Sequence, residues 1–412
     1  MVARLSRLLT FPLILVAMLS IYRFLLFPNW GIGDAPREFD WSRNEPWLIE
    51  PQQDIPEVAT DQQLAKVLDR IKPPRISSGN VDSVNTNNLL HALRLWGTEA
   101  DFGDPELPSG TLMKSYFLDN SQFNRLAGND LPSLYRVSDQ NIWVRAWEEG
   151  RDARYTTTSS YHLNDILATL AETGTPLDTA LKLQEGHFKV GDLLNSAMND
   201  FHLRQFESEW SAISYARYAF PIMKWKNTYG EKITVGKIVD NLIYAPPLNG
   251  PCRGTHRLEA LVVLYRADQQ AKQLKTTVQT RILQYLTNVS KLLVDGQTPA
   301  GYWTARWPEG IGARDDDKAS LRERILVTGH HLEWLALAPK EILPTREPIV
   351  RAGQWMVRTI DELDEQSLLE TYGPLTHAVR ALCLWRSRDP YQIWKSERLL
   401  KTPSDGTESE GT

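Results

Sequence analysis

Apolar residues recur at helical spacing through most of the chain. The stretch 276–294 places Val278, Ile282 and Leu286 on one face of a helix, and the stretch 347–363 has the same spacing. Alternating runs of β-branched residues, which are typical of strands, are scarce. The pattern therefore predicts an all-α body.

Several of these helices share a pattern that begins with histidine. Each segment has His at its first position and Leu or Val two positions later. The four segments are HALRLW (91–96), HRLEALVVLYRA (256–267), HHLEWLALA (330–338) and HAVRALCLW (377–385). A fifth, YHLNDILATLAETG (161–174), fits with Tyr161 at its head and His162 beside it.

A longer repeat extends the pattern. FKVGDLLNSAMNDF matches ITVGKIVDNLIYAP at an offset of 45 residues, which aligns Gly191 with Gly236 and Ser211 with His256. The heads then lie near residues 91, 161, 211, 256, 330 and 377. Six such units, each long enough for a helical hairpin, predict a closed ring in which the heads face one cavity.

Helix-start signals precede several heads. Gly254-Thr255 and Thr328-Gly329 are residue pairs of the kind that cap helix N-termini, where they satisfy free backbone N–H groups. We therefore expect these heads to lie at helix N-termini around one mouth.

The N-terminus carries the longest apolar run, residues 8–26, interrupted mainly by Arg23. A membrane span needs roughly 20 apolar residues. Arg4 and Arg7 precede the run and acidic residues follow Pro28, which favours a cytoplasmic N-terminus. We predict a single-pass anchor with the body outside the cytoplasm, in the periplasm if the source is bacterial. A cleaved signal peptide and a helix of the domain core are the alternatives.

The rest of the chain divides by composition. Seven prolines in residues 28–75 argue against regular structure, apart from a short helix at 61–71, so this range is predicted to be a stalk. The predicted organisation is an anchor at 1–27, the stalk at 28–75, the helical ring at 76–397 and a disordered tail at 398–412.

Two segments resemble known families. VTGHHLEWLALAP (327–339), after WTARWPEG (303–310), resembles the GHxxEWxxLL helix of the N-acylglucosamine 2-epimerase and cellobiose epimerase group. LLVDGQTPAGYWTARW (292–307) resembles the hairpin turns of squalene cyclases and prenyltransferase β subunits. Both resemblances imply an α/α toroid, with a carbohydrate or an isoprenoid-like ligand. The DxDD run of a class II cyclase, the zinc triad of a protein prenyltransferase and the Arg-rich motifs of the epimerases do not occur.

The head histidines are the main catalytic candidates, because imidazole exchanges protons near neutral pH. In the epimerase group, the matching His is a general acid/base. The candidates are His256, His330, His331 and His377, supported by Glu259 and Glu333 three residues after a head. Structural roles, as helix caps or salt-bridge partners, are the alternative.

A metal site and a cysteine nucleophile have weaker support in the sequence. A metal site is not predicted and no cofactor is expected, because HxH and HxxEH spacings are absent. Of the two cysteines, Cys252 would need His256 as a base to act as a nucleophile, and we favour a packed loop residue. Cys383 is expected in the core.

Ligand contacts are expected from aromatic residues near the mouth, which stack on sugars or line lipid pockets. The candidates are Trp210, Tyr302, Trp303, Trp307 and Arg257. Acids and amides in the cavity would favour a sugar, and a wall of Trp, Leu and Phe would favour a lipid.

The predicted function is an enzyme acting on such a small molecule. A non-catalytic extracytoplasmic ligand- or protein-binding module and a structural scaffold are the alternatives. The net charge of −5, without a basic stripe, excludes nucleic acid as a partner.

Overall fold

The computed structural model describes residues 37–76, 85–127, 131–138, 141–145, 160–205, 207–245 and 251–401. The predicted anchor at 1–27 lies outside these residues. Within them, every helix is too short or too polar to cross a membrane.

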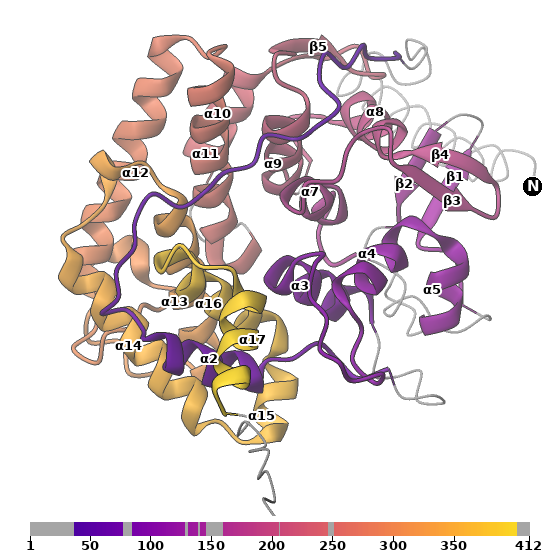
Figure 1. Ribbon diagram of the computed structural model, residues 1–412. Coiled ribbons are helices and arrows are strands. Elements are labelled where there is room, and N and C mark those ends of the chain that lie inside the picture. The colour runs from indigo at the N-terminus through magenta and orange to yellow at the C-terminus, as the bar shows by residue number, and fades with distance from the viewer. Residues whose placement is uncertain are drawn as a thin grey trace, which may run out of the picture.

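The described chain is predominantly helical, and six of its helices contact one another in cyclic order (Figure 1). Each packs against the next, and the last returns to the first. In chain order they are α3 (Thr86–Trp96), α7 (Asp165–Glu172), α9 (Glu209–Tyr218), α11 (Pro251–Ala271), α13 (Leu321–Leu337) and α16 (Tyr372–Trp385). These six helices, which we call the ring, carry five of the six predicted heads, and the head near residue 161 lies just before α7.

The remaining helices alternate with these six along the chain. They are α2 (Asp61–Arg70), α4 (Gly110–Leu118), α5 (Asn120–Ala127), α8 (Val190–Asp200), α10 (Val235–Tyr244), α12 (Thr276–Gly296), α14 (Arg346–Glu362), α15 (Glu365–Glu370) and α17 (Pro390–Lys401), with 3₁₀ turns at Trp307–Ala313 and Lys340–Ile342. On α12 the predicted apolar face, including Val278, Ile282 and Leu286, is buried. The helical periodicity therefore identified the packed face correctly.

Three antiparallel hairpins correct the expectation of an all-α body. They are β1 (Tyr135–Ser138) with β2 (Asn141–Val144), β3 (Ala180–Leu183) with β4 (Gly186–Lys189), and β5 (Lys224–Lys226) with β6 (Lys232–Thr234). Strands of three or four residues are too short to show a periodic pattern. The repeat at an offset of 45 residues corresponds to two of them, because β4 leads into α8 and β6 leads into α10.

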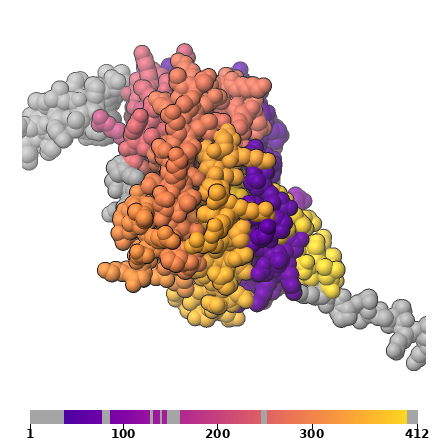
Figure 2. All heavy atoms as spheres, turned by 90° about the vertical axis from the view of Figure 1, so that its left-hand side faces the viewer, coloured from indigo at the N-terminus to yellow at the C-terminus, as the bar shows by residue number. Residues whose placement is uncertain are grey.

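The proline-rich range also differs from its prediction. Residues 37–76 lie along the surface of the body, as the indigo band in Figure 2 shows. The Ile55 amide donates to the Trp385 carbonyl at 2.8 Å, and Val58 and Leu64 are fully buried. Apart from α2, prolines prevent regular structure here, but the apolar side chains still pack. This part of the predicted stalk therefore belongs to the folded body.

The start of α13 corrects the predicted caps. Ser320 is the N-cap, and its hydroxyl accepts from the Glu323 amide at 3.2 Å, so His330 lies well inside the helix. A Cβ on Gly329 would lie 3.0 Å from the Cα of Ala378, so this glycine lets α13 and α16 pack closely. The predicted start of the tail at residue 398 is also corrected, since α17 continues to Lys401.

Candidate functional site

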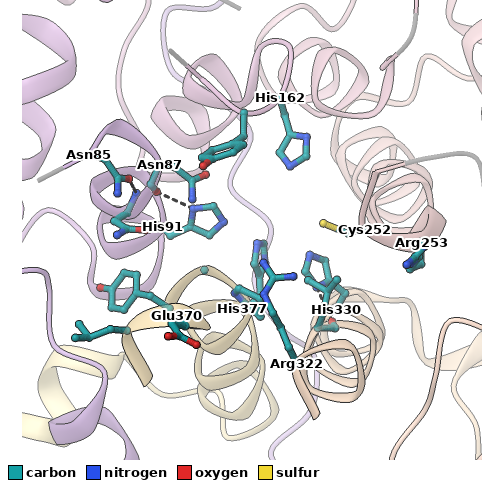
Figure 3. A pocket seen from close by; sticks show the side chains of 17 residues that line it. Asn85, Asn87, His91, His162, Cys252, Arg253, Arg322, His330, Glu370 and His377 are labelled. Carbon is teal, nitrogen blue, oxygen red and sulfur yellow. Dashed lines mark hydrogen bonds between the residues drawn. The ribbon is translucent and has the colours of Figure 1, made fainter. Parts of the chain in front are cut away.

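Five histidines from five segments of the ring face one another, four of them in Figure 3. They are His91 on α3, His162 just before α7, His256 on α11, His330 on α13 and His377 on α16. Ring centroids are 5.0 Å apart for His91 and His377, 4.0 Å for His377 and His330, 4.9 Å for His330 and His256, and 5.1 Å for His256 and His162. The heads thus form one continuous cluster of imidazoles.

A layer of charges lies one helical turn beyond this cluster. A residue three positions after each head shares its helix face, and Arg94, Glu259, Glu333 and Arg380 occupy these positions. Arg94 pairs with Glu172, Glu259 and Glu333, and Arg380 pairs with Glu333. Side chains of Arg94 and these glutamates are at most 4% exposed. Glu259 and Glu333, which we predicted to support the head histidines, belong to a buried ion network.

The network sets the charge of its carboxylates. Burial raises the pKa of Glu333, but Arg94, His377 and Arg380 outweigh it and hold that pKa well below its usual range. At Glu259 burial, together with the negative charges of Glu333 and Glu172, outweighs Arg94 and raises the pKa to about 7.

Hydrogen bonds orient four of the five imidazoles. In His91, His162 and His330, Nδ1 faces a carbonyl or carboxylate oxygen, which only accepts, so Nδ1 carries the proton and Nε2 presents a lone pair in the neutral ring. Nδ1 of His377 lies between the Glu333 carboxylate and Nη1 of Arg94, which is 3.0 Å away and only donates. The facing oxygens are Leu326 O for His330 at 2.7 Å, Asn87 O for His91 at 2.8 Å, Glu333 Oε2 for His377 at 2.7 Å and Glu207 Oε1 for His162 at 3.1 Å. The fifth, His256, has a buried Nδ1 without a partner in the described chain, and its Nε2 lies 3.0 Å from Nε2 of His330.

Cys252 lies at this cluster on a strained turn. Cys252, Arg253 and Gly254 all have positive φ, at 49°, 61° and 76°, immediately before the regular part of α11. Left-handed conformations of non-glycine residues are costly and concentrate at functional sites. The Trp307 indole donates to the Arg253 carbonyl at 3.2 Å and holds the turn. The sulfur points into the space between the imidazoles (Figure 3).

The imidazoles favour the thiolate form of Cys252. Burial raises the pKa of this thiol, but His256 and His330 outweigh burial and bring the pKa well below its usual range. Burial lowers the pKa of His162 and His330, but Cys252, together with Glu207 at His162 and Glu333 at His330, outweighs burial and raises both pKa values. At His256, burial prevails and the pKa falls. Cys252, which we expected to be a packed loop residue, lies among imidazoles.

The cluster forms the floor of a pocket of about 630 Å³, which His91, His162, Cys252, His330 and His377 line and His256 does not. Its wall is mainly polar: Asn85, Asn87, Asn88, Arg253, Arg322 and Glu370, with Leu326, Leu369 and Pro374 as apolar contributors. Tyr372 also lines it, and its hydroxyl is buried without a hydrogen-bond partner among the described residues. A free polar group at a pocket wall is available to a ligand.

His331 does not join the cluster. One residue along a helix turns about 100°, so His331 points away from its neighbour His330. Its Nδ1 accepts from the Trp334 indole at 3.0 Å, and its ring meets those of Trp303 and Trp307 edge-on. The prediction of His331 as an acid/base partner is corrected: it is a core residue.

Most of the predicted ligand contacts lie elsewhere as well. Trp303 is fully buried and donates to the Leu293 carbonyl at 2.8 Å, and Trp307 supports the Cys252 turn. Tyr302 packs against Trp355, with ring centroids 5.1 Å apart and the ring planes tilted by 49°.

Two remaining candidates differ from each other. Arg257 is buried and bonds the Ala245 carbonyl, outside the pocket lining. Trp210 does reach the cluster, since its ring lies 4.8 Å from that of His256 and the Arg94 guanidinium lies over it at 4.9 Å.

Among the described residues, two groups of side chains in this cluster are spaced to hold a metal ion. The first is His162, Cys252 and His256, and the second is His256, His330 and His377. Within each group the three ligand atoms lie within 4.8 Å of one another. Sequence spacing brought together only Cys252 and His256, because the members of these groups come from four separate segments.

Comparison with models of known protein families, with curated proteins and with solved structures gives no match. The chemistry of the site therefore has to be inferred from its residues.

Proposed function

We propose that the chain is an α/α toroid of six helical hairpins. The cyclic contacts of α3, α7, α9, α11, α13 and α16 support this assignment. So does the sequence repeat, whose six heads fall on these six helices or directly before them. In such a ring the inner helices bring residues from every repeat to one cavity.

The function we propose is an enzyme that uses acid–base chemistry on a small, polar, carbohydrate-like molecule. The observation that carries it is the convergence of the head histidines and Cys252 at the floor of one polar pocket. Acid–base partners must reach a common reacting atom. His330 and His377 both line the pocket, which suits that role.

The pocket wall favours a polyol over an isoprenoid chain. Asparagine amides, the Tyr372 hydroxyl and the Arg322 guanidinium offer hydrogen bonds to hydroxyl groups. Tyr302, Trp303 and Trp307, which a lipid would need along the wall, pack between helices and do not line this pocket.

Binding measurements test the substrate class. Isothermal titration with neutral monosaccharides and 2-acetamido sugars should give saturable binding, and farnesyl diphosphate should not bind. Tyr372→Phe should weaken sugar binding about 10-fold, roughly the value of one buried hydrogen bond. Its stability should not fall, because the lost hydroxyl has no partner in the described chain.

A matched control keeps this test specific. Asn87→Leu, in the pocket, should weaken binding, whereas Asn288→Leu, in a separate surface hollow beside Thr287, should not. Farnesyl diphosphate binding in place of sugars would overturn the carbohydrate assignment. Sugar binding without turnover of any bound sugar would favour a binding module over an enzyme.

We also propose that residues 1–27 anchor the chain in a membrane, with the body outside the cytoplasm. The apolar run and its flanking arginines support this. The expected result is recovery of the full chain in the membrane fraction after a carbonate wash, with the body open to protease added from the extracytoplasmic side. Release by carbonate would contradict the anchor.

A further inference from the structure

We propose that the pocket floor binds one divalent transition-metal ion of the zinc class, with His162, Cys252 and His256 as its ligands. This inference deepens the proposed function by naming the cofactor of the same site, and its catalytic role rests on that function. Imidazole and thiolate are the ligands that zinc prefers in proteins.

The spacing of the three ligand atoms suits a single ion. Zinc binds nitrogen at about 2.0–2.1 Å and thiolate sulfur at about 2.3 Å, so two tetrahedral ligands lie roughly 3.5 Å apart. The three atoms lie within 4.8 Å of one another. Small side-chain rotations would therefore bring them to bonding distance.

The surroundings of these ligands resemble those of a metal site. The Glu207 carboxylate accepts from Nδ1 of His162, the arrangement that fixes the tautomer of a metal-bound histidine. The buried Nδ1 of His256 has no partner in the described chain, and a buried polar atom of this kind calls for a missing partner.

Two features favour this group over His256, His330 and His377. It contains the thiol Cys252, which a strained turn holds at the cluster, and backbone strain of this kind points to a constrained role. His377, in contrast, already has its Nδ1 between the Glu333 carboxylate and the Arg94 guanidinium of the buried ion network.

Three protein ligands leave one position open to the pocket. Catalytic zinc sites have this form, whereas structural sites are closed by four protein ligands. At that position the ion would polarise an oxygen of the substrate or of a bound water. His330 and His377, which line the same pocket, then lie beside the polarised group.

Titration of the metal-free full-length protein with Co²⁺ tests the proposal directly. The expected result is one ion per chain and a thiolate-to-cobalt charge-transfer band in the near ultraviolet. Zn²⁺ should displace the Co²⁺ and protect Cys252 from iodoacetamide. Cys252→Ser should abolish the band, and His162→Ala and His256→Ala should each weaken binding at least 100-fold.

Controls separate ligation from folding. Cys383→Ser and His202→Ala change a cysteine and a histidine away from the cluster, and both should leave the Co²⁺ spectrum unchanged. Glu207→Gln keeps the ligands but alters the partner of His162, and should weaken binding about 10–100-fold. Far-ultraviolet circular dichroism identifies any variant that fails to fold, in which case wild-type alkylation with and without Zn²⁺ still decides the point.

Each other outcome overturns part of the proposal. Failure of the wild type to bind Co²⁺ or Zn²⁺ would overturn the metal site, and sugar binding by the same metal-free protein would leave the proposed function standing. Binding without a charge-transfer band, retained in Cys252→Ser and lost in His377→Ala, would overturn this ligand set in favour of the second.

Discussion

Charged side chains are buried in the interior of this ring, where they pair with one another. Glu333 accepts from His377 and pairs with Arg94 and Arg380, and its own side chain is 1% exposed. Buried ions are tolerated only when such partners are present, because desolvation is costly. Removing one partner of a buried ion pair should therefore cost more stability than removing one partner of an exposed pair.

Glu333→Gln should lower the free energy of unfolding by about 3–5 kcal/mol, because it leaves Arg94 and Arg380 short of negative charge. Urea denaturation measures the change. Glu57→Gln, which removes an exposed pair with Arg346, should cost less than about 1 kcal/mol. Equal losses in the two variants would contradict the buried network.

At the scale of helices, a single glycine can determine how closely two of them pack. The clearest is between α13 and α16, where Gly329 packs directly on the backbone of Ala378. These helices carry His330 and His377, so their separation fixes the distance between two pocket residues.

Gly329→Ala should destabilise the protein by about 1–3 kcal/mol, because a Cβ there would lie 3.0 Å from the Cα of Ala378 and force the helices apart. Thermal or urea unfolding measures the loss. In Gly236→Ala the added Cβ would meet Val278 at an ordinary 3.7 Å, so this helix variant should be neutral or more stable by up to about 1 kcal/mol. A tolerated Gly329→Ala would show that α13 and α16 can separate without cost.

At the scale of the whole molecule, residues 37–76 tie distant parts of the ring together. Arg386, at the end of α16, bonds the Asp54 carboxylate, the Ala59 carbonyl and Asp61. The Trp47 amide donates to the carbonyl of Arg217, a residue of α9, at 2.7 Å. This segment thus contacts helices on two sides of the ring.

Arg386→Ala should lower the free energy of unfolding by about 1.5–3 kcal/mol, because it removes charge-assisted bonds from a buried guanidinium. It should also speed proteolytic cleavage within residues 37–76. Its neighbour Arg388 is 44% exposed and pairs with Asp61, so Arg388→Ala should cost less than about 1 kcal/mol. Unchanged proteolysis in Arg386→Ala would show that the segment is held by its apolar contacts instead.

The sequence by itself determined the helical class, the buried face of α12 and the register of the histidine heads. These features are local, since a 3.6-residue period specifies which residues share a face. For the same reason, the position of Glu259 and Glu333 one turn after a head followed from the sequence, although the presence of Arg94 between them did not.

The tertiary structure alone decided which residues meet. His162 joins Cys252 and His256 through packing between segments far apart in the chain, and no spacing in the sequence encodes that contact. The left-handed turn at Cys252 has no sequence signal, because non-glycine residues adopt it only when the surrounding structure enforces it. His331 was misplaced because helix rotation and ring packing, not residue type, decide which of two adjacent histidines faces the pocket.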